Sequence, residues 1–585
     1  MIRSKFLVSL SATAALFCAI STTADAKTTA KNVPVQFLGI NDLNGYIDST
    51  YTNSAGKTIG GMASLAYNLS KEKQAFAKTN NLKSANTNSI SVHTGDILGG
   101  GPAISSLLQD HPTISILNAM NFQLGVIGNH ELNEGLDEFL RVIQGKKATY
   151  DTPNYDLVSR YKIEKSNTTL LAANVVNKKS KKTISGFKPY EIKTINGVKV
   201  GFIGVVDPYV QQLIMPTHTK NLSFTDPAKA IAKYDKVLRK KGVKAIVVLA
   251  HAGAENTGTS NQTIETQAAK PNKAQVGGSV TQIIDKLDKI APNHSVDIVF
   301  GGHSHSFANG LYGKKNIRVV ESLDYGKSYN VATGKISTTT NDFVKTPAAT
   351  VKYNYTRSNT VINKNSVAKN VNRIVQNAAQ LTATVTRAQI ATLDAERLSS
   401  VRIAKIGGSA VGNLVADSQL ALMKNLERHV DFAFTNSGGV RDDLVATVND
   451  GRNIITWEAA QKVQPFSNFL YTGQLTGAQI TQVLNEQFSG GRGLEVAGLH
   501  YTYNDKEIVD VFVGDKSSSE KIVANKSYTV VLNNYLTGGG DNFPTFTKLK
   551  NSEIIGIDTD TFIDYLKAMK NVPTAYTPRS VQVEK

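Results

Sequence analysis

The chain has 585 residues, of which 41% are hydrophobic and 19% charged, and this composition excludes both a disordered chain and a polytopic membrane protein. Its 65 Lys and Arg residues against 47 Asp and Glu residues give a formal net charge of +18. Because the sequence holds no long basic run with interleaved aromatic residues, we interpret this excess as the basic surface of an exported protein and expect no binding of duplex nucleic acid.

Residues 1–26 have the layout of a secretory signal peptide. Arg3 and Lys5 precede an apolar run, and Ala24-Asp25-Ala26 supplies small residues at a cleavage position. The apolar run is too short to span a bilayer comfortably, and the single cysteine, Cys18, lies within it. We therefore expect an exported chain without a transmembrane segment or disulfides, which is secreted, cell-wall-associated or periplasmic. Its charge favours electrostatic association with an anionic cell envelope.

Short apolar runs alternate with helical patterns through the first half of the chain. The runs are typical of buried strands and cover residues 33–40, 89–94, 123–127, 198–206, 244–250 and 296–300. Helical patterns at 103–120 and 227–240 separate some of them. This alternation predicts an α/β sandwich whose strands are mostly buried. The polar stretch 254–278 lacks periodicity and indicates a surface insertion.

Polar side chains that can bind metal ions follow many of these strands. They are Asp42, Asp96, Asn129, His130, His251, His303 and His305. Strand ends meet at one rim of a sheet, so we expect these side chains to lie together. Asp, Asn and His supply the mixed oxygen and nitrogen donors that suit two divalent ions sharing a carboxylate. His303 and His305 are two residues apart, and on an extended segment both point the same way.

The second half of the chain begins with a polar helical pattern over 365–393, which we interpret as a helix connecting two domains. A second α/β region follows from about residue 395. Its expected helices lie near 412–428 and 476–488, and its expected strands near 432–435 and 528–532.

Five motifs of the first half resemble those of the calcineurin-like metallophosphoesterases, specifically the exported 5′-nucleotidase / UDP-sugar hydrolase / 2′,3′-cyclic-nucleotide phosphodiesterase family. They are Gly39-Ile40-Asn41-Asp42-Leu43-Asn44-Gly45, Gly95-Asp96, Gly128-Asn129-His130-Glu131, His251-Ala252-Gly253 and Gly301-Gly302-His303-Ser304-His305. Segments similar to that family's second domain lie at 412–417, 435–441, 455–458, 465–466 and 534–541. The resemblance implies a four-layer α/β/β/α metallophosphoesterase sandwich over 32–360, a linker helix over 361–393 and a smaller α/β substrate-binding domain over 394–585.

The resemblance also implies a two-metal centre. It assigns one ion to Asp42, Asn44, Asp96 and His305, and the other to Asp96, Asn129, His251 and His303, so that Asp96 is the bridge. Zinc or manganese are the expected ions. Water activated by the ions would attack phosphorus in line, while His130 contacts the phosphoryl group and the residue at position 133 orients His130.

Two positions depart from the family's pattern. Asn44 stands where the family has a metal-binding histidine, and an amide oxygen binds a zinc-like ion more weakly than imidazole does. Asn133 stands where the family has an aspartate that orients the catalytic histidine, so it brings no charge unless Glu134 or Asp137 supplies one. We therefore expect a first metal ion that is looser or less selective for zinc, and a turnover that these residues can lower.

In the second domain the resemblance implies binding of AMP-like nucleotides. The rings of Phe466 and Tyr535 would stack on the base, and Arg441 would meet phosphate or ribose oxygens. Asn436 and Asp541 would hydrogen-bond the base or the ribose. The expected activity is removal of phosphate from nucleotides. The alternatives are 2′,3′-cyclic phosphodiesterase or UDP-sugar hydrolase activity at the same site, or a weakly active or non-catalytic nucleotide-binding protein.

Overall fold

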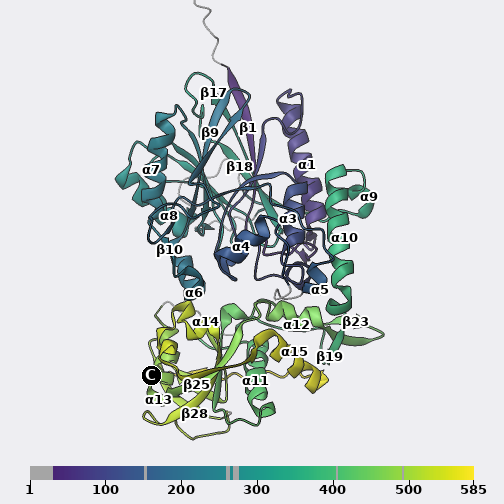
Figure 1. The fold of residues 1–585 in the computed structure, drawn as a ribbon, viewed down its shortest axis with the longest axis vertical. Helices are drawn as coiled ribbons and strands as arrows, with labels where there is room; N and C mark the ends of the chain where they lie inside the picture. The colour runs from purple at the N-terminus through teal and green to yellow at the C-terminus, as the bar shows by residue number, and fades with distance from the viewer. Residues whose placement is uncertain are drawn as a thin grey trace, which may run out of the picture.

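The computed structural model describes residues 31–149, 155–257, 264–267, 276–402, 406–489, 493–514 and 516–584. The expected signal segment, residues 1–26, lies outside the described residues. Figure 1 shows two α/β domains joined by the long helix α10 (Ser366–Thr386), which runs from the N-terminal towards the C-terminal domain. Across the described ranges, no helix combines the length and the apolar character needed to cross a membrane.

Two six-stranded sheets form the N-terminal domain. The first has the order β18-β17-β1-β4-β5-β6, with β1 (Asn32–Ile40), β4 (Ser89–His93), β5 (Phe122–Val126), β6 (Thr169–Leu171), β17 (Ser328–Ser337) and β18 (Ala348–Tyr353). The second has the order β15-β16-β14-β11-β9-β8, with β8 (Tyr190–Ile195), β9 (Val198–Val206), β11 (Ala245–His251), β14 (Val296–Phe300), β15 (Ala308–Tyr312) and β16 (Ile317–Glu321). The consecutive strands β1-β4-β5-β6 of the first sheet and β9-β11-β14-β16 of the second are parallel.

The two sheets pack face to face through large apolar side chains. The rings of Phe37 in β1 and Phe202 in β9 lie 5.7 Å apart, and each buried ring stabilises the fold by about 1.5–3 kcal/mol. At Gly39 a Cβ atom would fall 2.8 Å from the ring of Phe300, so only glycine permits this approach. Helices cover the outer faces, which gives the expected α/β/β/α order: α1 (Met62–Thr79), α3 (His111–Ala119) and α10 on one side, and α7 (Pro227–Lys240) and α8 (Ser279–Ile290) on the other.

This domain also contains smaller elements. They are β2 (Thr50–Thr52), β3 (Thr58–Gly60), α2 (Ala103–Ser106), α4 (Leu136–Ile143), α5 (Tyr155–Val158), β7 (Val175–Asn177), α6 (Pro216–Thr219), β10 (Leu222–Phe224) and α9 (Asn359–Ile362). In the expected insertion over 254–278, the described ends pair as β12 (Glu255–Asn256) and β13 (Val276–Gly277).

The C-terminal domain is built on three smaller sheets, besides a two-stranded pairing of β20 (Arg397–Leu398) with β22 (Leu444–Val445). Their orders are β26-β21-β29-β25-β30, β23-β24-β19-β31 and β28-β27-β32. The strands of the first are β21 (Phe432–Asn436), β25 (Phe469–Thr476), β26 (Leu494–Ala497), β29 (Ser527–Asn533) and β30 (Lys550–Ile557). The others are β19 (Gln389–Leu393), β23 (Thr447–Asn449), β24 (Arg452–Thr456), β27 (Leu499–Tyr503), β28 (Ile508–Val513), β31 (Asn571–Val572) and β32 (Ser580–Gln582). The helices are α11 (Ala410–Asn425), α12 (Trp457–Val463), α13 (Gly477–Glu486), α14 (Asn534–Thr537) and α15 (Asp558–Met569).

Two helical expectations were too long. The helix expected over 103–120 is two helices, α2 and α3, because Gln109 and Asp110 adopt φ values of +50° and +57°. The Asp110 carboxylate accepts hydrogen bonds from the backbone N–H of Gly99 and the hydroxyl of Ser105, at 2.9 and 2.8 Å, which holds the break. The helical pattern expected over 365–393 stops at Thr386, since β19 pairs with β24 and β31 instead.

Candidate active site

The polar side chains expected at the strand ends come together at one rim of the sandwich. Asp42 follows β1, Asp96 follows β4, Asn129 follows β5, His251 ends β11, and His303 and His305 follow β14. Four of these residues have a positive φ: Asp42 (47°), Asp96 (50°), His303 (84°) and His305 (56°). Such backbone strain costs about 1–3 kcal/mol per residue and is concentrated at functional sites, so the loops turn sharply to present these side chains.

One group of three side chains has the spacing of a metal site. One donor atom from each of Asp96, His251 and His303 lies within 4.8 Å of the others. His251 Nε2 lies 3.3 Å from Asp96 Oδ2 and 3.2 Å from Asn129 Oδ1. His251 Nδ1 donates to the carbonyl oxygen of Thr94 at 2.8 Å, which aims Nε2 at this group, as in metal-binding histidines.

A second group surrounds Asp42. Its Oδ2 accepts hydrogen bonds from the side chain of Asn41 and the backbone N–H of His303, both at 2.8 Å. Its Oδ1 is buried, receives no hydrogen bond from the described residues, and lies 3.7 Å from His305 Nε2. His305 Nδ1 in turn lies 3.2 Å from a carboxylate oxygen of Asp324, which orients the ring.

Asn44 brings a second buried oxygen to this group. Its side-chain N–H donates to the carbonyl oxygen of Gly99 at 2.9 Å, which leaves Oδ1 buried and without a hydrogen-bond donor in the described part of the chain. Buried polar atoms are normally satisfied, and both this oxygen and Oδ1 of Asp42 are suitable cation ligands. The residues present therefore fit a centre that binds divalent cations through oxygen and imidazole nitrogen.

The electrostatics of the rim agree with this. Burial raises the pKa of Asp42, so its charge needs a cation to stabilise it. Burial alone would also raise the pKa of Asp96, but the charges of His251, His130 and His303 and the hydrogen bond from His251 together hold that pKa below its usual range. Asp96 likewise overcomes the burial of His251 and raises the pKa of the imidazole to about 10. A divalent cation would take the place of that proton.

His130 lies beside the bridging candidate and close to Asn133. Its backbone N–H donates to Asp96 Oδ1 at 2.8 Å, and the side-chain nitrogen of Asn133 lies 3.1 Å from His130 Nδ1. Burial lowers the pKa of His130 to about 4, although Asp96 opposes the shift. Because an amide nitrogen can only donate, Nδ1 accepts and Nε2 carries the proton of a neutral ring. Of the two acids considered as substitutes for the missing charge, Glu134 lines the same cavity and Asp137 lies in the first turn of α4.

Glu131 is a residue of this site to which sequence reasoning assigned no role. Its buried carboxylate accepts the backbone N–H groups of Asp96 (2.9 Å), Ile97 (2.7 Å) and Gly128 (2.6 Å), and so ties together the loops that follow β4 and β5. Burial raises its pKa to about 7. The sequence did hold a signal for this role, because Glu131 is an acidic residue at the end of the string Gly128-Asn129-His130-Glu131, next to a buried strand.

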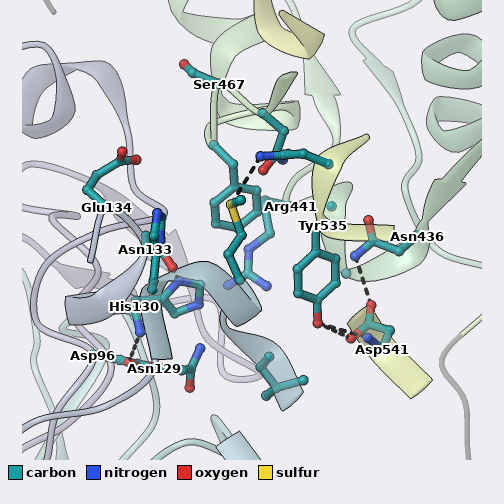
Figure 2. Close-up of a pocket in the computed structure, with 18 of the residues that line it drawn as sticks. Asp96, Asn129, His130, Asn133, Glu134, Asn436, Arg441, Ser467, Tyr535 and Asp541 are labelled. Atoms are coloured by element: carbon teal, nitrogen blue, oxygen red, sulfur yellow. Dashed lines mark hydrogen bonds between the residues drawn. The ribbon is translucent and has the colours of Figure 1, made fainter. Parts of the chain in front are cut away.

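The expected substrate-binding residues face these ligands across a cavity of about 430 Å³ (Figure 2). They are Asn436, Arg441, Phe466, Tyr535 and Asp541. The ring of Phe466 stacks flat on His130, with centroids 5.7 Å apart and an angle of 6° between the planes. The guanidinium of Arg441 lies 5.6 Å from the centre of the Phe466 ring.

Tyr535 and Asp541 hold each other in place. The hydroxyl of Tyr535 donates to Asp541 Oδ1 at 2.9 Å and accepts the backbone N–H of Asp541 at 3.0 Å. The side-chain N–H of Asn436 donates to the other carboxylate oxygen at 2.8 Å. The ring lies against Gly540, where a Cβ atom would fall 2.6 Å from it, so this glycine is what allows Tyr535 to stand at the cavity wall.

Tyr325 is a second residue that sequence reasoning missed. Its backbone N–H donates to the carbonyl oxygen of Asp42 at 2.7 Å, and its ring stacks on Tyr46 with centroids 3.8 Å apart. Its hydroxyl accepts from Arg441 at 3.4 Å, and nearby the side chain of Gln461 donates to the carbonyl oxygen of Gly101 at 3.2 Å. The two domains therefore touch at the site itself.

Comparisons with known proteins agree with this architecture. Residues 37–307 match the family model described as calcineurin-like phosphoesterase, and residues 383–548 match 5′-nucleotidase, C-terminal domain. A 5′-nucleotidase precursor from Thermus thermophilus has the same fold, with a TM-score of 0.72 at 20% identity, covering 94% of this chain and 100% of that one.

Relatives are also similar in sequence. Cell wall protein Lmo0130 of Listeria monocytogenes is 38% identical, over 93% of this chain and 68% of that protein. Endonuclease YhcR of Bacillus subtilis is 32% identical, and the chain spans only 40% of its length. NAD 5′-nucleotidase of Haemophilus influenzae is 26% identical over 98% of this chain and 96% of that protein. Given both domain matches in this order and a relative at this identity, the chain belongs to the calcineurin-like phosphoesterases that carry a 5′-nucleotidase C-terminal domain, which are hydrolases.

Proposed function

We propose that this chain is an exported phosphohydrolase with two metal ions that removes the phosphate of nucleotides and releases nucleoside and phosphate. One observation carries the proposal. Asp96 and His303, which cluster with His251, line the same cavity of about 430 Å³ as the aromatic rings of Phe466 and Tyr535. A single cavity thus offers cation ligands for a phosphoryl group at one wall and stacking surfaces for a base at the other.

The metal ions would be held as the strand ends suggest. One ion would bind Asp42, Asn44, Asp96 and His305, and the other Asp96, Asn129, His251 and His303. The ions, zinc or manganese, would supply Lewis-acid polarisation of the phosphoryl oxygens and activation of the attacking water. The two buried oxygens that receive no hydrogen bond from the described parts of the chain, on Asp42 and Asn44, support the first of these sites.

The chain's own side chains would position the substrate and stabilise charge. His130, neutral and protonated at Nε2, would donate a hydrogen bond to a phosphoryl oxygen, and Asn133 would hold its tautomer. Arg441, whose Nε is buried without a hydrogen-bond partner in the described structure, would meet phosphate or ribose oxygens. Asn436 and Asp541 would contact the base or the ribose.

The substrate class we propose is the AMP-like nucleoside monophosphate. Stacking between Phe466 and Tyr535 tolerates different bases because every base has two aromatic faces. The same site would admit a 2′,3′-cyclic phosphodiester or a UDP-sugar. The names of two relatives, NAD 5′-nucleotidase of Haemophilus influenzae and trifunctional nucleotide phosphoesterase protein YfkN of Bacillus subtilis, support nucleotides as the substrate class.

In this proposal the domains divide the work. Residues 32–360 would perform the chemistry, 361–393 would connect the domains, and 394–585 would bind the nucleoside. Residues 1–26 would direct export and be removed, and the chain would then be secreted, cell-wall-associated or periplasmic. Its similarity to a protein named as a cell wall protein supports that location.

The test is phosphate release from AMP by the purified protein, first after chelation and then with zinc, manganese, magnesium or calcium restored. We expect turnover that depends on the restored ion and is lost in Asp96→Asn. Rates on 2′,3′-cyclic AMP and UDP-glucose, compared with the rate on AMP, show which class of phosphate ester the protein prefers. If the protein still binds AMP but releases no phosphate with any ion, the catalytic proposal is wrong and the non-catalytic nucleotide-binding alternative replaces it.

A further inference from the structure

The basic charge of the chain is concentrated in one stretch of the N-terminal domain. Residues 178–244 hold 15 Lys and Arg residues but only four Asp and Glu residues, and so carry +11 of the formal net charge of +18. The lysines are spread along this stretch, and it is the fold that gathers them. The strand β7 pairs with β10, and β10 leads directly into α7, which lies at the outer edge of the domain in Figure 1.

Helix α7 presents a row of lysines to solvent, which we call the lysine stripe. It consists of the exposed residues Lys229, Lys233, Lys236 and Lys240. The intervals of four, three and four residues place all four on one face of the helix, over a length of about 16 Å. The opposite face is fixed, since Ile231 and Leu238 are buried in the core beside the second sheet.

The acidic side chains of α7 and of its N-cap form ion pairs with residues outside the lysine stripe. Asp226 caps the helix by accepting the backbone N–H of Lys229 at 3.2 Å, and its carboxylate pairs with Lys286 at 2.6 Å. Asp235 is buried and pairs with Arg239 at 2.9 Å. The ion pairs that the structure describes for this helix therefore leave the stripe out. Like charges four residues apart destabilise a helix, and a bound polyanion would remove that repulsion.

A second basic segment continues the stripe. The turn after β7 carries four exposed lysines, Lys178, Lys179, Lys181 and Lys182. The backbone N–H of Lys178 donates to the carbonyl oxygen of Asn221 at 2.9 Å, beside the exposed Lys220 and just before the strand that leads into α7. The turn therefore lies next to the start of the strand that leads into α7, and we call these nine exposed lysines together the basic face.

We propose that this basic face binds a linear phosphodiester polymer of the cell envelope, of the poly(alditol phosphate) kind. Regularly spaced ammonium groups on flexible stems suit a chain of repeating phosphates. Export, as proposed above, is what makes an envelope polymer the available polyanion. The inference does not depend on catalytic activity, and the experiment below is read without any turnover measurement.

Two other polyanionic partners, single-stranded nucleic acid and an anionic membrane, fit the basic face less well. Proteins that bind single-stranded nucleic acid offer aromatic rings for stacking. Here the rings of Tyr190 in β8 and Tyr234 in α7 are partly buried, and the ammonium groups of Lys241 and Lys233 lie over them at 5.3 and 4.9 Å. An interfacial membrane helix needs large apolar side chains that can insert into lipid. The exposed large apolar side chains described in this structure lie outside α7.

The test compares two variants of equal charge. One replaces the lysine stripe (Lys229→Gln, Lys233→Gln, Lys236→Gln and Lys240→Gln), and the control replaces four exposed lysines elsewhere (Lys364→Gln, Lys369→Gln, Lys424→Gln and Lys506→Gln). The probe is soluble poly(glycerol phosphate), titrated over a series of salt concentrations. We expect the stripe variant to bind about tenfold more weakly or worse, with a salt slope reduced by about 3, as for four lost phosphate contacts.

Further variants and ligands distinguish specific binding by the stripe from an effect of net charge. Replacing the stripe by arginine keeps the charge and should restore binding, and thermal unfolding shows whether each variant is folded. Equal weakening in the stripe and control variants would mean that only net charge matters and would overturn the proposal. Tighter binding of a single-stranded oligonucleotide or of phosphatidylglycerol vesicles than of poly(glycerol phosphate) would overturn the choice of partner.

Discussion

The side-chain nitrogen of Asn133 lies 3.1 Å from Nδ1 of His130, where related enzymes are expected to have a carboxylate. The amide donates to Nδ1, so it fixes the ring and its tautomer but adds no negative charge. A carboxylate would instead accept from Nδ1–H and favour the imidazolium form. In this protein, Asn133 therefore orients the His130 ring as a carboxylate would, but it does not favour the positively charged form of the ring.

Asn133→Asp should raise the pKa of His130 and increase kcat on AMP at neutral pH, because a charged ring stabilises the developing phosphoryl charge better than a neutral one. The measurement is kcat and KM against pH for the two proteins with the same metal. Asn133→Ala is the control, since it removes the orienting hydrogen bond and should lower kcat. An unchanged kcat in both variants would show that position 133 does not act through His130.

Asn44→His should shift the metal preference of the site towards zinc, because imidazole is a better zinc ligand than an amide oxygen. Competition with a chelator measures the affinity for zinc and for manganese separately. Asn44→Ala should weaken binding of both ions, since it removes the buried oxygen altogether. Equal affinities in all three proteins would exclude residue 44 from the metal centre.

Glu131→Gln should destabilise the loops that carry Asp96 and Asn129. In the native protein backbone N–H groups donate to both carboxylate oxygens of Glu131, whereas glutamine offers them a single oxygen. Each hydrogen bond to a charged group is worth about 1.5–3 kcal/mol. We expect a lower melting temperature and weaker metal retention after dialysis. Glu164→Gln is the matched control, because it breaks only a surface ion pair with Lys162 and should change neither quantity.

Glu495 should make the C-terminal domain less stable as pH rises. Burial raises its pKa to about 7 from 4.5, so between these pH values the folded protein binds more protons than the unfolded chain. Its contribution to stability is complete below pH 4.5 and is lost as pH rises through 7. Glu495→Gln should remove this loss, a gain of about 3 kcal/mol above pH 7 at about 1.4 kcal/mol per pKa unit.

Chemical denaturation from acid to mildly alkaline pH tests the last prediction. Glu495→Gln and the unsubstituted protein should agree at low pH and diverge as pH rises. The side-chain oxygen of glutamine can still accept the N–H of Ser409, which now donates at 2.8 Å. The exposed Glu520→Gln serves as a control and should leave the pH profile unaltered. Parallel profiles for all three proteins would contradict a perturbed Glu495.

Much of the fold was predictable because strands buried on both faces read as continuous apolar runs. The runs at 198–206 and 296–300 coincide with β9 and β14. The break between α2 and α3 was not predictable, because it depends on a side chain reaching another loop: Asp110 binds the backbone of Gly99. The end of α10 at Thr386 was missed for a similar reason, since β19 forms through pairing with β24 and β31, both more than fifty residues away.

For the candidate site, the residues expected to follow strands do lie at one rim of the sandwich, and Asp96, Asn129, His130, His303 and His305 line the cavity there. Their supporting residues were not predicted from the sequence. Glu131 acts through backbone N–H groups of two loops, and Tyr325 through a hydroxyl that reaches Arg441 in the other domain. Gly128 is close to Glu131 in sequence, but Asp96 lies 35 residues from Glu131 and Arg441 lies 116 residues from Tyr325, so spacing along the chain did not reveal the contacts between these loops and domains.

The flat stack of Phe466 on His130 affects how fast a nucleotide can be loaded. A base cannot lie on the same face of the Phe466 ring while the imidazole covers it, so loading that face requires the rings to separate. Separation moves one domain relative to the other, because the rings belong to different domains. Each catalytic cycle would then include a large-scale displacement through solvent, and added viscogen should slow kcat even when the chemistry itself is fast.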